Sequence, residues 1–279
     1  MPELPEVRVH AERLTHDYGG SVLTGFRALS FTALKTFSPQ PDAAFGEALR
    51  DVTTRGKFLM LNFETVTFVV HLMQGGRLVV DPKVSAKPRG GLCRWTFAEG
   101  PALLFTEAGT EKKAGVWVLA PPVDGSPPMS ELGPEADTVT SAELDTILDE
   151  AKGSRLHGVL RDQHRLAGLG RRLANEICWT AKLSPFSACA KLDTDQRQRL
   201  HAAIIGCVTE SVDDERTRDH MAKSAVRVAH VHHRRGEPCN RCGDTIREVT
   251  YNAYAVNYCA TCQTRGRVLA DNTTSKFLK

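Results

Sequence analysis

Residues 239–262, CNRCGDTIREVTYNAYAVNYCATC, contain two close cysteine pairs separated by sixteen residues. Each pair can place two thiolates on one tight turn, and four thiolates close a tetrahedral metal site with no position left for water. The alternating residues between the pairs predict a β-hairpin. Two unrelated pairs are the alternative. We predict one structural Zn²⁺ and a zinc-ribbon hairpin over residues 236–270, with the ligands Cys239, Cys242, Cys259 and Cys262.

The sequence around this hairpin is basic. The chain of 279 residues has a net charge of +3, but residues 216–241 hold six arginines and one lysine against two acidic residues. Such a patch favours a polyanionic partner such as nucleic acid, although a solvated loop is an equal alternative on charge alone. No apolar run is long enough to span a bilayer, and the N-terminal residues lack a basic-then-apolar leader. We therefore expect no membrane partner and a cytoplasmic location.

The rest of the chain predicts an α+β protein with several domains. A helix over residues 5–18 precedes short β-rich runs, which indicate an antiparallel β-sandwich domain over 1–120. Five prolines between residues 120 and 137 predict a linker at 121–136. Beyond it the pattern is helical, which indicates a helical domain over 137–235, with the hairpin and a tail (271–279) after it. The β-rich runs are residues 57–63, 66–73, 93–97, 102–108 and 115–120, and the helices are expected near 140–151, 156–160, 171–183 and 193–212.

The first residues, MPELPEV, offer a second kind of chemistry. Removal of Met1 would make Pro2 the N-terminal residue, and an α-amino group with a pKa of about 8 is partly unprotonated at neutral pH. Such an amine can attack an electrophilic sugar carbon and give an iminium, with Glu3 as proton donor and acceptor and Glu6 orienting the amine. The alternative is an ordinary helix N-terminus, where proline and glutamate are common.

Five stretches together resemble the formamidopyrimidine-DNA glycosylase / endonuclease VIII family. They are MPELPEV, RGKFLML around Lys57, HLMQGGRL around His71, RDQHRLAGLGRRLANE and GEPCNRC…YCATCQ, in this order. The resemblance implies a base-excision-repair enzyme that removes oxidised or damaged bases and cleaves abasic sites through a Pro2 iminium. It also implies a helix–two-turn–helix element that grips phosphates. The expected partner is double-stranded DNA with damaged bases or abasic sites, bound by a monomeric, bacterial-type protein that associates with the nucleoid.

The resemblance also implies DNA contacts, and several of them depart from the family pattern. Lys57 and His71 match positions that contact phosphate or assist the lyase step, and Arg77 is a further candidate contact. Arg171 stands where an asparagine is usual, and Tyr254 stands where the hairpin usually presents an arginine. The residues expected to fill the space left by a flipped base are Gln74, Lys112 and Ala114, with Met73 as a substitute.

Two other interpretations remain open. The altered contacts favour a paralogue that binds damaged DNA without removing bases, whereas Pro2, Glu3 and Glu6 favour catalysis. An RNA-binding protein with a similar helical element and a zinc ribbon leaves the MPELPEV stretch unexplained.

Overall fold

The computed structural model describes residues 1–109, 113–222, 226–251 and 254–269, which belong to two compact units. Unit 1 comprises residues 1–131 together with the described part of 215–224, and unit 2 comprises the remainder from Leu132 onward. This division differs from the predicted domains. The zinc-ribbon hairpin shares a unit with the helices, and the segment predicted to continue the helical domain returns to unit 1 at Glu215.

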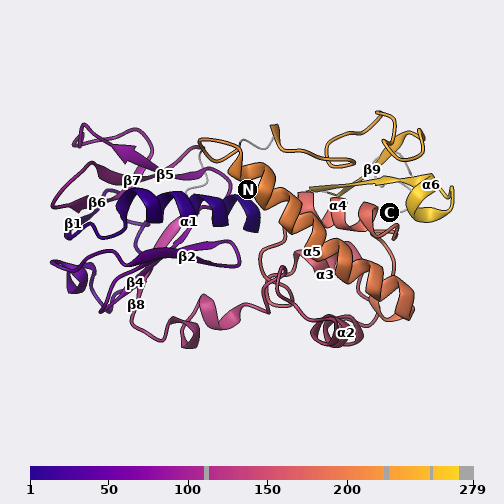
Figure 1. Ribbon diagram of the computed structural model, residues 1–279, viewed down its shortest axis with the longest axis horizontal. Helices are drawn as coiled ribbons and strands as arrows, with labels where there is room; N and C mark the ends of the chain where they lie inside the picture. The colour runs from indigo at the N-terminus through magenta and orange to yellow at the C-terminus, as the bar shows by residue number, and fades with distance from the viewer. Residues whose placement is uncertain (110–112, 223–225, 252–253, 270–279) are drawn as a thin grey trace. The chain divides into compact units, whose positions relative to one another are not determined.

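Unit 1 is an antiparallel β-sandwich with an N-terminal helix, as predicted (Figure 1). The helix α1 spans Leu4–Tyr18, close to the predicted bounds. One sheet has the strand order β1 (Leu23–Ala28), β6 (Gly91–Phe97), β7 (Ala102–Glu107) and β5 (Gly76–Asp81). The other has the order β2 (Asp51–Arg55), β3 (Phe58–Asn62), β4 (Thr67–His71) and β8 (Gly115–Leu119). Short 3₁₀ turns occupy Pro41–Ala44, Val123–Gly125 and Met129–Glu131, the last two within the predicted linker.

The core of unit 1 contains aromatic side chains from both sheets. Phe68 of β4 lies edge-on to Trp95 of β6, with ring centroids 5.8 Å apart, and both side chains are fully buried. The apolar face of α1 completes the same core, and Tyr18 packs against Phe97 with centroids 5.2 Å apart. In Figure 1, α1 is seen between the strands of the two sheets. The first residues of the chain are therefore attached to a rigid body.

The segment that follows Asp214 joins unit 1 through buried polar contacts. Arg13 of α1 lies 3.6 Å from the Glu215 carboxylate and donates hydrogen bonds to the carbonyls of Glu215 and Arg218. The Glu215 carboxylate is 2% exposed and accepts the N–H of Ala222, while Met221 enters the core. A charge this deeply buried requires such partners, so these contacts hold the segment against α1.

Unit 2 combines helices with the cysteine-bearing hairpin. Its elements are α2 (Ser141–Glu150), α3 (Leu156–Arg161), α4 (Arg171–Thr180), the 3₁₀ turn Cys189–Lys191, α5 (Thr194–Arg216, whose last two residues lie in unit 1), β9 (Ile246–Tyr251), β10 (Tyr254–Cys259) and α6 (Ala260–Thr264). The predicted capping box of α2 is confirmed, because the Glu143 N–H donates to Thr140 Oγ1 while the Thr140 N–H donates to the Glu143 carboxylate. The β9–β10 hairpin packs against α4 (Figure 1).

Candidate functional sites

The N-terminal carboxylates form a reciprocal cap at the start of α1. The Glu3 N–H donates to Glu6 Oε2 at 2.7 Å, and the Glu3 side chain accepts the Glu6 N–H. Pro2 is buried, and the Glu3 and Glu6 residues are 4% and 2% exposed. Two buried bonds leave the peptide after Pro2 little freedom. Glu6 thus holds the backbone N–H of Glu3, the residue that follows Pro2.

Lys57 lies in the turn between β2 and β3, and His71 ends β4, the strand that pairs with β3. Lys57 is buried and follows Gly56, whose φ of 57° closes the β2–β3 turn, and His71 ends β4 opposite Phe58. The Met73 N–H donates to His71 Nδ1 at 3.2 Å, so a neutral ring carries its proton on Nε2. Burial, aided by the Lys57 charge, lowers the pKa of His71 to about 4. At neutral pH, His71 can therefore offer an N–H donor to a ligand but no positive charge.

We expect the depressed pKa of His71 to make stability depend on pH. Because the folded pKa lies below the unfolded value of 6.5, the unfolded chain binds more protons between these two values, and stability falls as pH drops from 6.5 to 4. This loss amounts to about 3 kcal/mol. The free-energy difference between wild type and His71→Gln, measured by urea unfolding, should shrink by that amount between pH 7 and pH 4. A difference that stays constant over this range would contradict the assignment.

The residues predicted to fill the space left by a flipped-out base follow β4 or precede β8 in the sequence. Gln74 is exposed in the β4–β5 turn, whereas Met73 packs against the core. Arg77, in β5, donates to the Gly76 carbonyl at 2.6 Å. Lys112 lies outside the described residues. Ala114 is 1% exposed, so its side chain is buried in the core and is not available to replace a base.

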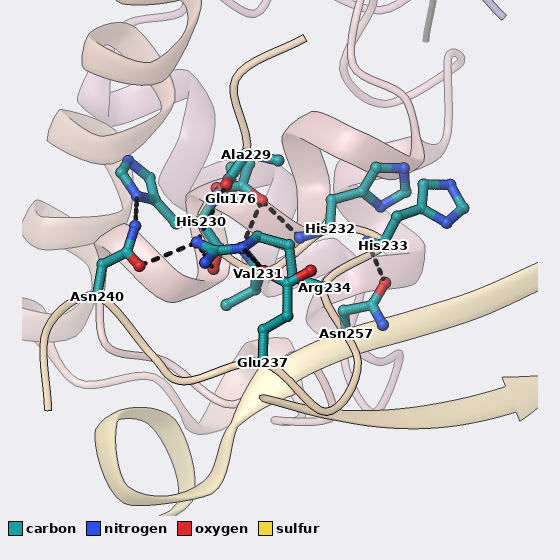
Figure 2. Close-up of polar contacts among 10 residues, drawn as sticks. All are labelled: Glu176, Ala229, His230, Val231, His232, His233, Arg234, Glu237, Asn240 and Asn257. Atoms are coloured by element: carbon teal, nitrogen blue, oxygen red, sulfur yellow. Dashed lines mark hydrogen bonds and ion pairs between the residues drawn. The ribbon is translucent and has the colours of Figure 1, made fainter. Parts of the chain in front are cut away.

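In unit 2, a buried carboxylate on α4 collects three backbone donors from the histidine-rich segment (Figure 2). Glu176 accepts the N–H groups of His230 at 2.7 Å, Val231 at 3.1 Å and His232 at 2.9 Å. The N–H of the next residue, His233, donates to Asn257 Oδ1 of β10 at 3.0 Å. Successive amides aimed at one carboxylate fix the course of a backbone that has no helix or strand of its own.

We expect Glu176→Gln to destabilise unit 2 by about 2–4 kcal/mol, because the amide group places a donor against a buried N–H and removes the charge. Urea unfolding and amide hydrogen exchange of residues 230–232 measure the effect. Glu210→Gln, an exposed change on α5, is the matched control and should stay within about 0.5 kcal/mol. Unchanged exchange at residues 230–232 in Glu176→Gln would refute this role of the carboxylate.

The four predicted metal ligands converge at one point. Their sulfur atoms all lie within 4.8 Å of one another, with 3.4 Å between the Cys242 and Cys259 sulfurs and 3.9 Å between those of Cys239 and Cys262. Four sulfurs at zinc–thiolate distance from one ion are about 3.8 Å apart, so the set fits a tetrahedral metal site. The other four cysteines are buried and separate from this group.

A tryptophan connects the metal site to α4. Trp179 Nε1 donates to Cys239 Sγ at 3.4 Å, and the Trp179 carbonyl accepts a bond from Arg241 at 2.8 Å. The Arg241 guanidinium lies 3.8 Å from the centroid of the same indole, and the His230 ring stacks at 4.4 Å. Outer contacts of this kind orient a ligating thiolate. The metal site and α4 therefore form one packed structure.

The remaining predicted contacts, Arg171 and Tyr254, both lie in unit 2. Arg171 is the first residue of α4 and is partly exposed. It directly follows the glycine turn, which contains Gly168 and Gly170. Tyr254 begins β10, where His157 stacks on its ring at 6.1 Å and the Arg161 guanidinium lies 4.1 Å from its centroid. Sequence reasoning missed Arg161; its four-residue spacing from His157 predicts a shared helix face, but nothing local links that face to Tyr254. Among the described helices, none is both long and apolar enough to cross a membrane.

Comparison with known proteins supports this description. The model of the formamidopyrimidine-DNA glycosylase N-terminal domain matches residues 1–110, and that of the zinc finger found in FPG and IleRS matches residues 236–265. A formamidopyrimidine-DNA glycosylase of Chloroflexus aurantiacus is 29% identical over 94% of this chain and 98% of its own length. An uncharacterized formamidopyrimidine-DNA glycosylase-like protein of Mycobacterium tuberculosis is 38% identical over 56% of this chain and 99% of its own.

Solved structures share the fold over nearly the whole chain. The Lactococcus lactis Fpg (MutM), in complex with DNA containing an oxidized pyrimidine, superposes with a TM-score of 0.83 at 21% identity, covering 94% of this chain and 99% of that one. MutM (Fpg) of Thermus thermophilus gives 0.81 at 24% identity with the same coverage. With both ends matched by family models and full-length relatives aligned, the chain belongs to the formamidopyrimidine-DNA glycosylase family.

Proposed function

We propose that this protein is a base-excision-repair DNA glycosylase that also cleaves the strand at abasic sites, with Pro2 as its nucleophile. The observation that carries the proposal is the cap formed by Glu3 and Glu6, which buries two carboxylates beside Pro2 on a rigid helix. Burying two acids at a chain terminus is costly, and one ordinary cap needs only one of them. The two buried carboxylates are explained if one positions a terminal amine and the other exchanges protons with it.

In the proposed reaction, the damaged nucleotide leaves the duplex and the unprotonated Pro2 nitrogen attacks the sugar C1′. The bond from C1′ to the base breaks, and the base leaves with its electron pair and a proton. Ring opening gives an iminium between Pro2 and C1′. Loss of a C2′ proton then expels the 3′ phosphate, and water releases the sugar remnant from Pro2. Glu3 supplies and removes protons in these steps.

The DNA contacts of the proposed enzyme come from both units. Lys57 and Arg77 offer positive charge and His71 an N–H donor, while Arg171 offers a guanidinium at the N-terminal end of α4, where anions are favoured. Gln74 and Lys112 are the proposed residues at the vacated base position, and Tyr254 the proposed hairpin contact. The four cysteines would bind one Zn²⁺, which supplies structure and takes no part in the reaction. The protein would act as a monomer in the cytoplasm, on the nucleoid.

A binding-only paralogue is the second candidate, and one observation favours it. Ala114 is buried, and Gln74, the described residue proposed for the base position, has little apolar bulk with which to keep a nucleotide flipped out. Such a protein would recognise damaged DNA without removing bases.

Duplexes that carry an oxidised purine, an oxidised pyrimidine or a preformed abasic site separate the two candidates. The proposed enzyme releases a free base from at least one lesion and cleaves the abasic strand. Tight binding of all three duplexes without any product would instead identify the binding-only protein.

A further inference from the structure

We propose that Arg161, held flat on the ring of Tyr254, binds a phosphate of the DNA backbone. This inference rests on the proposed function and assigns a role to a residue that sequence reasoning missed. Arg161 is the last residue of α3, and its guanidinium carbon lies 4.1 Å from the centroid of the Tyr254 ring. Both residues are partly exposed, so the stacked pair is accessible from solvent.

The stack is built from one face of a helix. His157 and Arg161 are four residues apart on α3 and therefore project from the same side. The His157 ring lies at 15° to the Tyr254 ring, with centroids 6.1 Å apart, so both helix residues meet the same tyrosine. A guanidinium stacked on an aromatic face loses little freedom when it then binds an oxyanion, and its edge remains available for hydrogen bonds.

No carboxylate of a described residue forms an ion pair with Arg161. The neighbouring arginine is different, because Arg165 pairs with Asp162 at 3.3 Å. A positive charge that is fixed in place and left without an acidic partner suits an anionic ligand better than one that a carboxylate already neutralises.

The surroundings of Arg161 also favour an anion. The Gln163 amide donates to the carbonyls of Arg161 and Leu169, at 2.8 and 2.9 Å, and accepts the Gly168 N–H at 3.0 Å. This side chain holds the end of α3 beside the glycine turn that leads into α4. Arg161 therefore stands near the positive end of a ten-residue helix, whose first residue is Arg171. The hairpin position that lacks an arginine is thus supplied with one from α3.

The test measures the salt dependence of binding to a duplex with a tetrahydrofuran abasic analogue, using the full-length protein with its metal bound. Arg161→Gln should weaken binding roughly tenfold at low salt. The slope of log K against log salt should become shallower by about one, which is the loss of one phosphate contact. Arg165→Gln, which removes an arginine that is already paired, should keep the wild-type slope. Arg161→Lys should restore the slope but not the full affinity, because an ammonium does not stack flat.

A double-mutant cycle tests the positioning role of Tyr254. Tyr254→Leu should weaken binding less than Arg161→Gln does, and the double variant should lose less than the sum of the two single losses, because part of the Tyr254 effect acts through Arg161. Thermal melting and metal content identify any variant that fails to fold. A wild-type slope in folded Arg161→Gln, or additive losses in the cycle, would overturn the proposal. If the protein binds DNA but neither releases a base nor cleaves the strand, the proposed catalysis is wrong, and the salt slope still tests the role of Arg161. If the wild-type protein binds no DNA, both proposals are wrong.

Discussion

Blocking the nitrogen of Pro2 with a preceding residue is expected to abolish strand cleavage at abasic sites, by at least about a thousandfold. An amide nitrogen shares its lone pair with a carbonyl and cannot attack C1′, whereas a terminal proline nitrogen can. Single-turnover cleavage of an abasic duplex measures the loss. Pro2→Gly is the control, because a terminal glycine keeps a primary amine and should retain reduced activity. Equal rates for blocked and free protein would place the nucleophile elsewhere.

Glu3→Gln separates proton transfer from helix capping within the same experiment. A glutamine oxygen still accepts the Glu6 N–H, so the reciprocal cap largely persists. Loss of general acid–base catalysis is expected to slow base release by about 10²–10⁴-fold. Loss of activity together with loss of thermal stability would indicate instead that Glu3 acts only through the cap.

Metal removal is expected to unfold the hairpin while the β-sandwich stays folded. Among the described residues, the buried cluster around the four sulfurs is small and comprises Trp179, Val231, Cys239, Ile246 and Cys259. A bound metal is therefore expected to supply much of the local stability, since a structural Zn²⁺ contributes on the order of 10 kcal/mol. Chelation should remove amide-exchange protection from β9 and β10, but not from β3 and β4.

The change should also reach α4, since Trp179 loses its sulfur acceptor and Arg241 its fixed position. Cys242→Ser should reproduce the effect and lower the metal content of the protein. Cys207→Ser, at a buried cysteine outside the cluster, is the matched control and should keep its metal. Full protection of β9 and β10 after verified metal loss would contradict a structural role.

Local patterns predicted much of this fold and the clustering of the four cysteines. The cysteine spacing, the Thr140 capping box and the β-rich runs at 57–63 and 66–73 are each set by a few neighbouring residues. All three predictions are confirmed. The strands β1, β2 and β5 were missed because polar residues or glycine interrupt their apolar residues, and in Gly76–Asp81 two consecutive residues are exposed.

The contacts that sequence could not predict join residues far apart in the chain. Glu176 accepts from amides 54 to 56 residues later, and Arg13 reaches Glu215 across 202 residues. These pairings depend on how the helices and strands pack, and the spacing of apolar residues along the sequence does not predict that packing. The same reason explains the domain boundary, since the return of residue 215 to unit 1 follows from a buried ion pair and not from composition.

The most direct test of the central claim is to locate the covalent bond to DNA. The protein is incubated with an abasic duplex under borohydride, digested, and the peptide that carries the reduced sugar is sequenced by mass spectrometry. Our account predicts one adduct, on the nitrogen of Pro2 in a chain that has lost Met1. An adduct on Lys57 or another lysine, or none from chains that begin at Pro2 and bind the duplex, would contradict it.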